Sequence, residues 1–290
     1  MKMKLRFLKL MLLLFILPLQ ILAAELGVAG KQLAALPGVS NVETLKSTHF
    51  PEKYVFFIKQ QLDAKDASKG YFEQRVVLCH RGFDRPTVLV TEGYNANYAL
   101  REGYIEELSK LFDTNIITVE YRYFDKSMPS PCNWDYLTVE NSLYDLHHVN
   151  QTLHAMYKGK WIATGISKGG QTTMFYRYTK PFKKYLSIRT AKGYLKKLMV
   201  PKGAENVKFS PVLYNHTVEF LTKNDPKMVY IYGDIDPWGA SGIYGLPFTK
   251  NKKNLHVYMC HGGSHKTRIL SFPEPTRQEI ISLIGSWLKK

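Results

Sequence analysis

The pattern of hydrophobic and polar residues divides the chain into two kinds of segment. Residues 53–60 and 70–81 alternate or run apolar and are rich in aromatic and β-branched side chains, a pattern typical of strands. A polar, turn-like stretch separates them, which predicts an antiparallel pair. The preceding residues 25–50 are mostly polar, and we expect them to be irregular.

From residue 86 onward, short continuous apolar runs alternate with segments of helical spacing. Such alternation predicts parallel β-α-β units and a sheet that is buried on both faces. The basic segment 179–209 contains no convincing buried strand. The predicted strands are 86–94, 115–123, 160–165, 227–233 and 254–260, and the predicted helices are 103–112, 139–157, 168–178, 210–224 and 274–290.

Composition allows a sizeable core, because the 290 residues are 45% hydrophobic and 22% charged. The net charge of +16 would suit an anionic partner, but the lysines are spread along the chain and no nucleic-acid motif accompanies them. We therefore interpret them as a solvated basic face and expect no nucleic-acid partner. The sequence carries no signal for an oligomeric state.

The first 24 residues resemble a secretory signal peptide. A basic start is followed by an apolar run over residues 10–22 and by Ala23 and Ala24, near which we expect cleavage. A membrane anchor is the alternative, but the run is shorter than the roughly 20 residues that a spanning helix needs. We expect an exported protein, periplasmic or extracellular, with no stable membrane span.

Export permits disulfides, but the chain has only three cysteines, Cys79, Cys132 and Cys260. At least one of them must stay unpaired. One disulfide is conceivable, and the sequence does not select its partners.

The strongest chemical signal is Gly-x-Ser-x-Gly around Ser167, where a predicted strand turns into a predicted helix. Gly165 and Gly169 allow the two backbones to approach closely, so that the hydroxyl projects from a strained elbow. The helix also directs its N-terminal NH groups to the same place. The alternative is an ordinary tight turn with a capping serine.

Downstream residues favour the nucleophile interpretation. Asp236 follows the predicted strand 227–233, and His265 follows the last predicted strand, so both should meet Ser167 at one edge of the sheet. Ser, Asp and His in this order form a catalytic triad. We expect Asp234 to cap a turn and His261 to be a loop residue.

Two further features complete the predicted site. The oxyanion hole should use the backbone NH of Lys168 and that of Gly93 or Tyr94. Glu92 and Glu120 end two predicted central strands and could bind a substrate ammonium group; alternatively, each pairs with a local arginine such as Arg122. The triad needs no metal or organic cofactor. A zinc site at Cys260, His261 and His265 is a weaker alternative, since no second ligand cluster appears.

Taken together, six segments resemble the secreted serine aminopeptidases of family S37, the tripeptidyl aminopeptidases related to the Streptomyces PS-10 enzyme. A more distant likeness extends to the Pro-Xaa carboxypeptidase and dipeptidyl peptidase group. The segments are FDRPTVLVTEGYNANYA, VEYRYFDKS, WDYLT, GKWIATGISKGGQT, PKMVYIYGDIDPWGA and GGSHKTRI.

This resemblance implies an α/β-hydrolase fold with a mostly parallel central sheet flanked by helices. It implies cleavage of short peptides, tripeptides, from substrates with a free N-terminus, with Ser167, Asp236 and His265 on the family's catalytic positions. On this interpretation residues 1–24 are the signal peptide, 25–178 and 210–290 form the two parts of the hydrolase domain, and 179–209 is a remnant of the helical lid.

The chain departs from the family in one respect. Only 69 positions separate Ser167 from Asp236, too few for the family's lid and for the sheet strand that follows the nucleophile helix. The shortened lid keeps two alternatives open: an esterase-like serine hydrolase with an open site, and an inactive remnant of a hydrolase.

Overall fold

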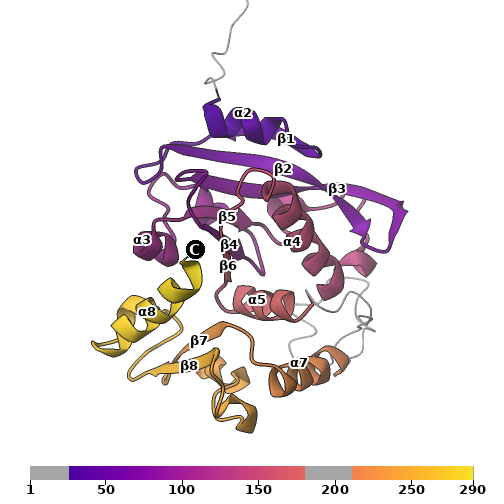
Figure 1. The fold of residues 1–290 in the computed structure, drawn as a ribbon. Helices are drawn as coiled ribbons and strands as arrows, with labels where there is room; N and C mark the ends of the chain where they lie inside the picture. The colour runs from indigo at the N-terminus through magenta and orange to yellow at the C-terminus, as the bar shows by residue number, and fades with distance from the viewer. Residues whose placement is uncertain (1–25, 180–210, 290) are drawn as a thin grey trace, which may run out of the picture.

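The structure, a computed structural model, describes residues 26–179 and 211–289. Its main sheet has six strands in the order β1-β2-β3-β5-β4-β6 (Figure 1). Pairing is antiparallel from β1 to β5 and parallel between β5, β4 and β6. The strands are β1 Val39–Thr44, β2 Glu52–Asp63, β3 Asp66–His80, β4 Thr87–Thr91, β5 Asn115–Val119 and β6 Trp161–Thr164.

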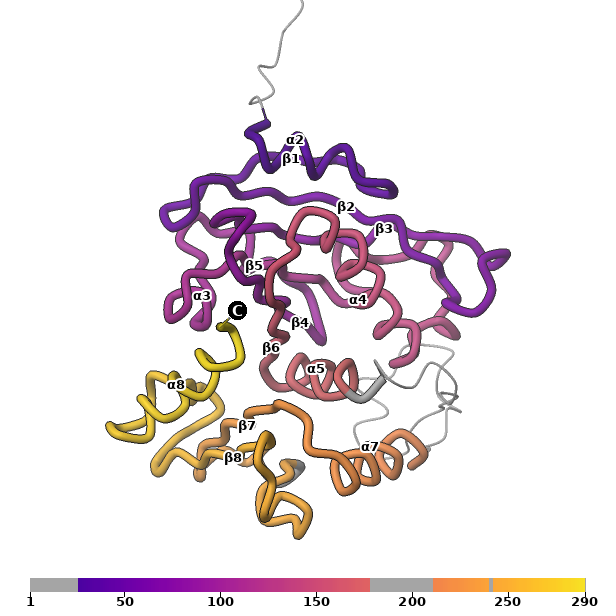
Figure 2. The backbone as a smooth tube through the Cα atoms, in the orientation of Figure 1, coloured from indigo at the N-terminus to yellow at the C-terminus, as the bar shows by residue number. Residues whose placement is uncertain are grey.

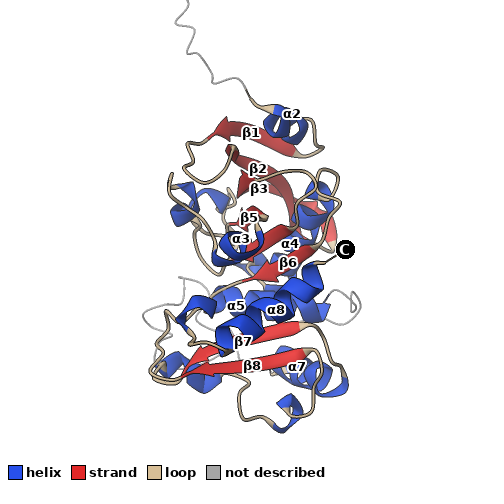
Figure 3. Cartoon of the chain, turned by 60° about the vertical axis from the view of Figure 1, so that its left-hand side comes forward, coloured by secondary structure: helices blue, strands red, loops and turns tan. Residues whose placement is uncertain are grey.

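The C-terminal strands form a separate sheet. β7 (Met228–Gly233) and β8 (Leu255–Cys260) pair in parallel along their whole length. Within the described residues no ladder joins β7 to β6, and helix α5 lies between the levels of the two sheets in Figures 1 and 3. The central sheet that the sequence predicts is therefore interrupted after β6.

Helices cover both faces of this arrangement. Leu146 of α4, Tyr176 of α5 and Phe220 of α7 belong to one apolar cluster, whereas Leu108 of α3 and Ile284 of α8 belong to another. The tube in Figure 2 shows α3 and α8 close together, away from α4. The helices are α2 Val28–Ala34, α3 Glu107–Phe112, α4 Val139–Leu153, α5 Lys168–Thr179, α7 Val212–Lys223 and α8 Thr276–Leu288, with short 3₁₀ helices at Asn97–Leu100, Asp125–Ser127, Trp134–Tyr136, Pro237–Ser241, Pro247–Thr249 and Ile269–Ser271.

Alternating side chains of the central strands supply both clusters. Leu89 and Ile117 face α4, whereas Val88 and Ile116 face α3 and α8. All five residues of β4 and all five of β5 are buried, as a parallel sheet covered on both sides requires. Each buried Val, Leu or Ile contributes about 1.5 to 3 kcal/mol, so these runs anchor the fold.

The prediction that residues 25–50 are irregular was wrong. They form α2 and the edge strand β1, which pairs with β2. Ala29 and Leu33 are fully buried, and the carboxylate of Glu52 accepts hydrogen bonds from the NH groups of Ala29 (3.1 Å) and Gly30 (3.3 Å). Contacts with β2, distant in sequence, decide this structure, and a local polar pattern could not indicate them.

The other predicted elements are present, with different ends. The helix predicted over 103–112 begins at Glu107, and the strand predicted over 115–123 ends at Val119. The predicted signal peptide (1–24) and almost all of the predicted lid remnant (179–209) lie outside the described residues. No helix in the described part of the chain is long and apolar enough to cross a membrane.

Candidate active site

Ser167 stands at a sharp turn between β6 and α5, with a backbone φ of 55°. Non-glycine residues adopt this left-handed conformation at a cost, and it commonly marks functional sites. The two glycines are needed for close approach: a Cβ on Gly165 would lie 2.3 Å from the Gly169 carbonyl oxygen, and one on Gly169 would lie 2.4 Å from that of Thr91. The turn has the backbone of a nucleophile elbow, and the Ser167 side chain is exposed.

Thr91, at the end of β4, ties this turn to the sheet. Its fully buried hydroxyl contacts the Gly169 carbonyl oxygen at 2.9 Å and the Thr173 hydroxyl at 2.6 Å. These contacts connect the first turn of α5 to the neighbouring strand. Sequence reasoning did not identify Thr91, because a threonine at a strand end carries no signal of its own.

Asp236 and His265 meet in the loops after β7 and β8. Asp236 Oδ2 lies 2.7 Å from His265 Nδ1, and its Oδ1 accepts a hydrogen bond from the Trp238 NH at 3.1 Å. The aspartate is 10% exposed and the histidine 40%. The Ile235 NH also donates to the Gly263 carbonyl, so the two loops are fastened together. With Nδ1 held by a carboxylate that is mostly shielded from water, Nε2 is the ring atom left for proton transfer.

A second pair of the same type lies beside it. His261 Nδ1 is 2.7 Å from Asp234 Oδ2, and the His261 ring is fully exposed. The sequence predicts a turn-capping role for Asp234 and a loop position for His261, and it does not indicate that the two side chains contact each other. Within the described residues no cluster of three or more His, Cys, Asp or Glu side chains could hold a metal ion.

The two halves of the predicted triad are not joined in this structure. Within the described residues no hydrogen bond links the Ser167 hydroxyl to His265. Ser167 follows β6 in the six-stranded sheet, whereas His265 follows β8 in the two-stranded one. Since β6 and β7 share no ladder, no strand pairing fixes the distance between the serine and the histidine.

The predicted oxyanion loop lies against the elbow. A Cβ on Gly93 would lie 2.5 Å from side-chain carbons of Lys168, so the backbone of this loop runs directly beside the residue after Ser167. Tyr94, by contrast, is 53% exposed. The structure thus brings Gly93, Tyr94 and Lys168 to the same place as Ser167.

Of the two predicted glutamates, Glu92 borders the site. It is partly buried and accepts a hydrogen bond from the Tyr98 hydroxyl, and burial raises the pKa of its carboxyl group. Among the described residues no arginine forms an ion pair with Glu92. A carboxylate that is partly shielded from water and lacks such a partner can accept a cationic group.

Glu120 is used within the fold. Its fully buried carboxylate forms an ion pair with Arg75 and accepts hydrogen bonds from the Ser127 hydroxyl (2.9 Å) and the Ala96 NH (3.2 Å). The alternative, pairing with an arginine, describes it better than ammonium binding, but the suggested partner Arg122 was wrong.

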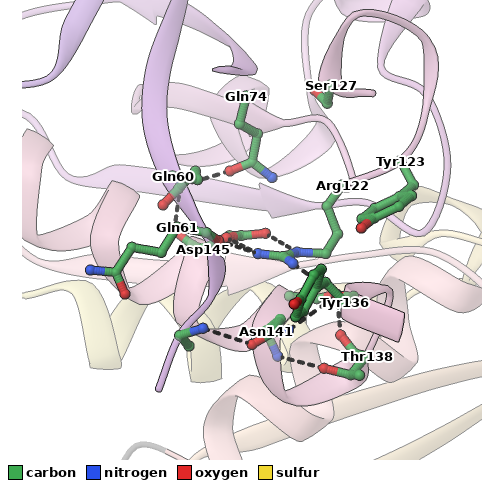
Figure 4. Close-up of polar contacts among 12 residues, drawn as sticks. Gln60, Gln61, Gln74, Arg122, Tyr123, Ser127, Tyr136, Thr138, Asn141 and Asp145 are labelled. Carbon is green, nitrogen blue, oxygen red and sulfur yellow. Dashed lines mark hydrogen bonds and ion pairs between the residues drawn. The ribbon is translucent and has the colours of Figure 1, made fainter. Parts of the chain in front are cut away.

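Arg122 instead pairs with Asp145 of α4, as Figure 4 shows. Its Nε and Nη2 atoms lie 2.7 and 2.8 Å from the two carboxylate oxygens, and Nη1 donates to the carbonyl groups of Leu62 and Tyr136. Both ionic side chains are buried, and every charged atom has a partner. This network fastens the end of β2 to α4.

The three cysteines are free thiols. Cys79 and Cys260 are buried and Cys132 is exposed. Burial raises the pKa of Cys79 to about 12, which keeps this thiol protonated and unreactive at neutral pH.

Comparison with known proteins gives consistent results. The model of the PS-10 peptidase S37 family matches residues 27–185. The prolyl tri/tetrapeptidyl aminopeptidase of Streptomyces mobaraensis is 37% identical over 142 residues, 49% of this chain and 29% of that protein. A probable serine protease of Arabidopsis thaliana is 28% identical over 116 residues, 35% of this chain and 24% of that protein. These matches cover less than a third of the length of either relative.

Solved structures share the fold. An S-formylglutathione hydrolase from Agrobacterium tumefaciens superposes with a TM-score of 0.53 at 11% identity, over 86% of this chain and 100% of that one. An esterase of Pyrococcus furiosus gives 0.50 at 15% identity, over 80% and 92%. At such identities the likeness concerns the fold alone, which is that of the α/β hydrolases.

Proposed function

Since the chain belongs to the PS-10 peptidase S37 family, we propose that it is a serine peptidase that releases short peptides from substrates with a free N-terminus. We further propose that the released product is a tripeptide, which the resemblance to the tripeptidyl aminopeptidases supports. One observation carries the proposal: a serine in a left-handed turn between two close-packed glycines, together with an Asp236–His265 pair at 2.7 Å.

The proposed reaction proceeds through an acyl-enzyme. Ser167 Oγ attacks the scissile carbonyl carbon while Nε2 of His265 takes the hydroxyl proton, and Asp236 holds the ring through Nδ1 and stabilises the imidazolium. The protonated histidine then gives its proton to the leaving amine. Water, activated by the same histidine, attacks the acyl group and regenerates Ser167.

Backbone NH groups would stabilise the tetrahedral intermediate. Lys168 begins α5, where the NH groups of the first turn have no partner within the helix, and the Gly93–Tyr94 loop runs beside it. Two such donors, from Lys168 and from Gly93 or Tyr94, suit a negatively charged oxygen. No metal or organic cofactor enters this scheme.

Glu92 is the proposed acceptor for the substrate's ammonium group. Its carboxylate directly precedes the proposed oxyanion donors of Gly93 and Tyr94. A substrate whose N-terminus binds to Glu92 would therefore place a fixed number of residues between that N-terminus and the scissile bond. Glu120 is not part of this proposal, because Arg75 and Ser127 already occupy its carboxylate.

A fluorophosphonate probe tests the nucleophile. We expect purified protein to be labelled at Ser167 and the Ser167→Ala variant to remain unlabelled, whereas Ser264→Ala, in the loop beside His265, should be labelled like the parent. Labelling depends on the activated hydroxyl and not on the substrate. A folded parent protein that resists the probe would show that this chain is an inactive remnant.

Substrate class needs a second measurement. The exposure of Ser167 and the shortened lid favour an open site, so an esterase is the second candidate. An alanyl tripeptide p-nitroanilide and a p-nitrophenyl ester should be compared side by side. Turnover of the anilide supports the peptidase, and turnover of the ester alone would support the esterase.

We also propose that the protein is exported to the periplasm or the extracellular space. The support is the sequence pattern of residues 1–24. Mass spectrometry of the protein secreted by its host should find an N-terminus near Glu25, and an intact Met1 would contradict cleavage.

A further inference from the structure

The side chain of Lys168 folds back over the oxyanion loop instead of extending into water. Its Nζ atom donates a hydrogen bond to the Gly93 carbonyl oxygen at 2.8 Å. The same atom lies 4.2 Å from the ring centroid of Tyr121, 5.1 Å from that of Tyr94 and 5.4 Å from that of Phe124. Three aromatic rings and one carbonyl thus surround the ammonium group.

This position is electrostatically unfavourable for a lysine. Lys168 is the first residue of α5, where the helix dipole repels a positive charge. Among the described residues no carboxylate forms an ion pair with it, and burial lowers the pKa of its amine. Contacts with the faces of aromatic rings offset these costs, because each ring attracts a cation. The arrangement holds the ammonium group at one point.

The hydrogen bond to Gly93 has a geometric consequence for the next residue. In a trans peptide the C=O and the following NH point in opposite directions. Holding the Gly93 oxygen therefore directs the Tyr94 NH away from Lys168 Nζ. On the other side, the Tyr94 carbonyl accepts a hydrogen bond from the Tyr121 NH at 3.1 Å. Both peptide groups flanking Tyr94 are thus fixed.

The Tyr94 NH itself has no hydrogen-bond acceptor among the described residues. The Gly93 NH differs, because it interacts with the Glu92 carboxylate. Burial raises the pKa of Glu92, and this interaction with the Gly93 NH partly opposes that rise. An unoccupied NH in a fixed orientation is what an oxyanion hole requires.

We propose that Lys168 is a positioning residue, whose caged ammonium group holds the Gly93 carbonyl and thereby makes the Tyr94 NH the second oxyanion donor. Lys168 then contributes twice, by its own backbone NH and by fixing the other donor through its side chain. This inference rests on the proposed serine hydrolase function.

The test compares Lys168→Met with the parent. Methionine keeps the length of the side chain but removes the NH donor and the charge. We expect fluorophosphonate labelling of Ser167 to slow about 100-fold, the lower end of the effect of losing one oxyanion donor. With a substrate, kcat should fall and KM stay within about twofold. Lys168→Arg, which keeps a cation and a donor, should restore part of the rate.

Lys158→Met is the matched control, since it makes the same change at an exposed lysine outside the site. Its labelling rate and thermal midpoint should equal those of the parent. If Lys168→Met stays folded by circular dichroism and labels as fast as the parent, the inference is wrong.

An NMR measurement separates this inference from the proposed function. The Tyr94 amide resonance, assigned by selective ¹⁵N-tyrosine labelling, should shift and broaden in Lys168→Met but not in Lys158→Met. This result is expected whether or not the parent reacts with the probe. An unchanged Tyr94 resonance would overturn the positioning role, whereas a parent that is never labelled would overturn the function alone.

Discussion

The nucleophile region, residues 26–179, and the His–Asp region, residues 211–289, differ in how their strands are enclosed. Every residue of β4 and β5 in the nucleophile region is buried. In the His–Asp region five of the six residues of β7 are only partly buried, although the strand is apolar on both faces. β6, the last strand of the nucleophile region, is partly buried throughout.

The difference follows from strand neighbours. β4 and β5 have partners on both sides, whereas β6 and β7 each have one. A strand that is apolar on both faces is suited to the interior of a sheet. β6 and β7 have such sequences, although each lies at the edge of its sheet. No strand pairing relates the two regions; side-chain packing and the hydrogen bonds from the Ile269 NH (3.1 Å) and Leu270 NH (3.0 Å) to the Glu107 carboxylate join them instead.

The largest expected effect distinguishes the two histidines of the His–Asp region. His265→Ala should slow fluorophosphonate labelling of Ser167 by at least about 1,000-fold, because the general base is lost. His261→Ala is the matched control and should change the rate less than about twofold, since its ring is fully exposed. Equal losses in both variants would contradict the assignment of His265.

A second prediction introduces the same steric conflict in each region. A Cβ on Gly169 would lie 2.4 Å from the Thr91 carbonyl oxygen, and one on Gly233 would lie 2.1 Å from that of Gly263. Gly169→Ala should lower the free energy of global unfolding by about 3 kcal/mol, because backbone atoms must move. Gly233→Ala should mainly increase amide exchange in β7 and β8.

Gly103→Ala provides the control, as no atom lies within 4 Å of its added Cβ. Denaturant unfolding and hydrogen exchange measured by mass spectrometry compare the three variants. If Gly233→Ala also accelerated exchange in β4 and β5, the two regions would unfold as one unit, and the comparison would fail.

The smallest effect concerns pH and the nucleophile region alone. Glu106 caps α3 by accepting a hydrogen bond from the Leu108 NH at 2.6 Å, and burial raises the pKa of its carboxyl group to about 7. Between pH 4.5 and about 7 the folded protein therefore keeps the Glu106 carboxyl group protonated. In the unfolded chain the same group has its usual pKa of 4.5 and has already lost its proton. The stability that this bound proton gives the folded protein is fully present below about pH 4.5 and is lost as the pH rises to 7.

Glu106→Gln should remove this dependence, because the amide oxygen can still accept the capping hydrogen bond. Between pH 4.5 and 8 the variant should gain stability relative to the parent, by up to about 2 kcal/mol, in urea unfolding. Glu102→Gln, at an exposed position, is the control. A constant difference between Glu106→Gln and the parent would contradict the raised pKa.

Local pattern was a good guide where neighbouring residues decide the structure. The runs that became β4 and β5 are apolar at successive positions, and Gly165 and Gly169 are small where two backbones approach. The same reasoning failed for residues 25–50, because Ala29 and Gly30 depend on Glu52 of another element.

Long-range partners were the least predictable feature of the candidate site. Glu120 pairs with Arg75, 45 residues earlier, although Arg122 is much nearer in sequence. Arg122 points to the opposite side of the chain, toward Asp145 of α4. Residues two apart near a strand end need not share an environment, and spacing alone does not indicate which charge each one meets.

The sequence by itself determined the order of strands and helices from β2 onward, the turn at Ser167, and the placement of Asp236 and His265 in adjacent loops, because periodicity and small residues act locally. Only the tertiary structure decided that the sheet divides between β6 and β7, that Arg75 occupies Glu120, and that Lys168 lies in an aromatic cage over Gly93. These outcomes depend on which distant surfaces pack together, and no local pattern encodes that choice.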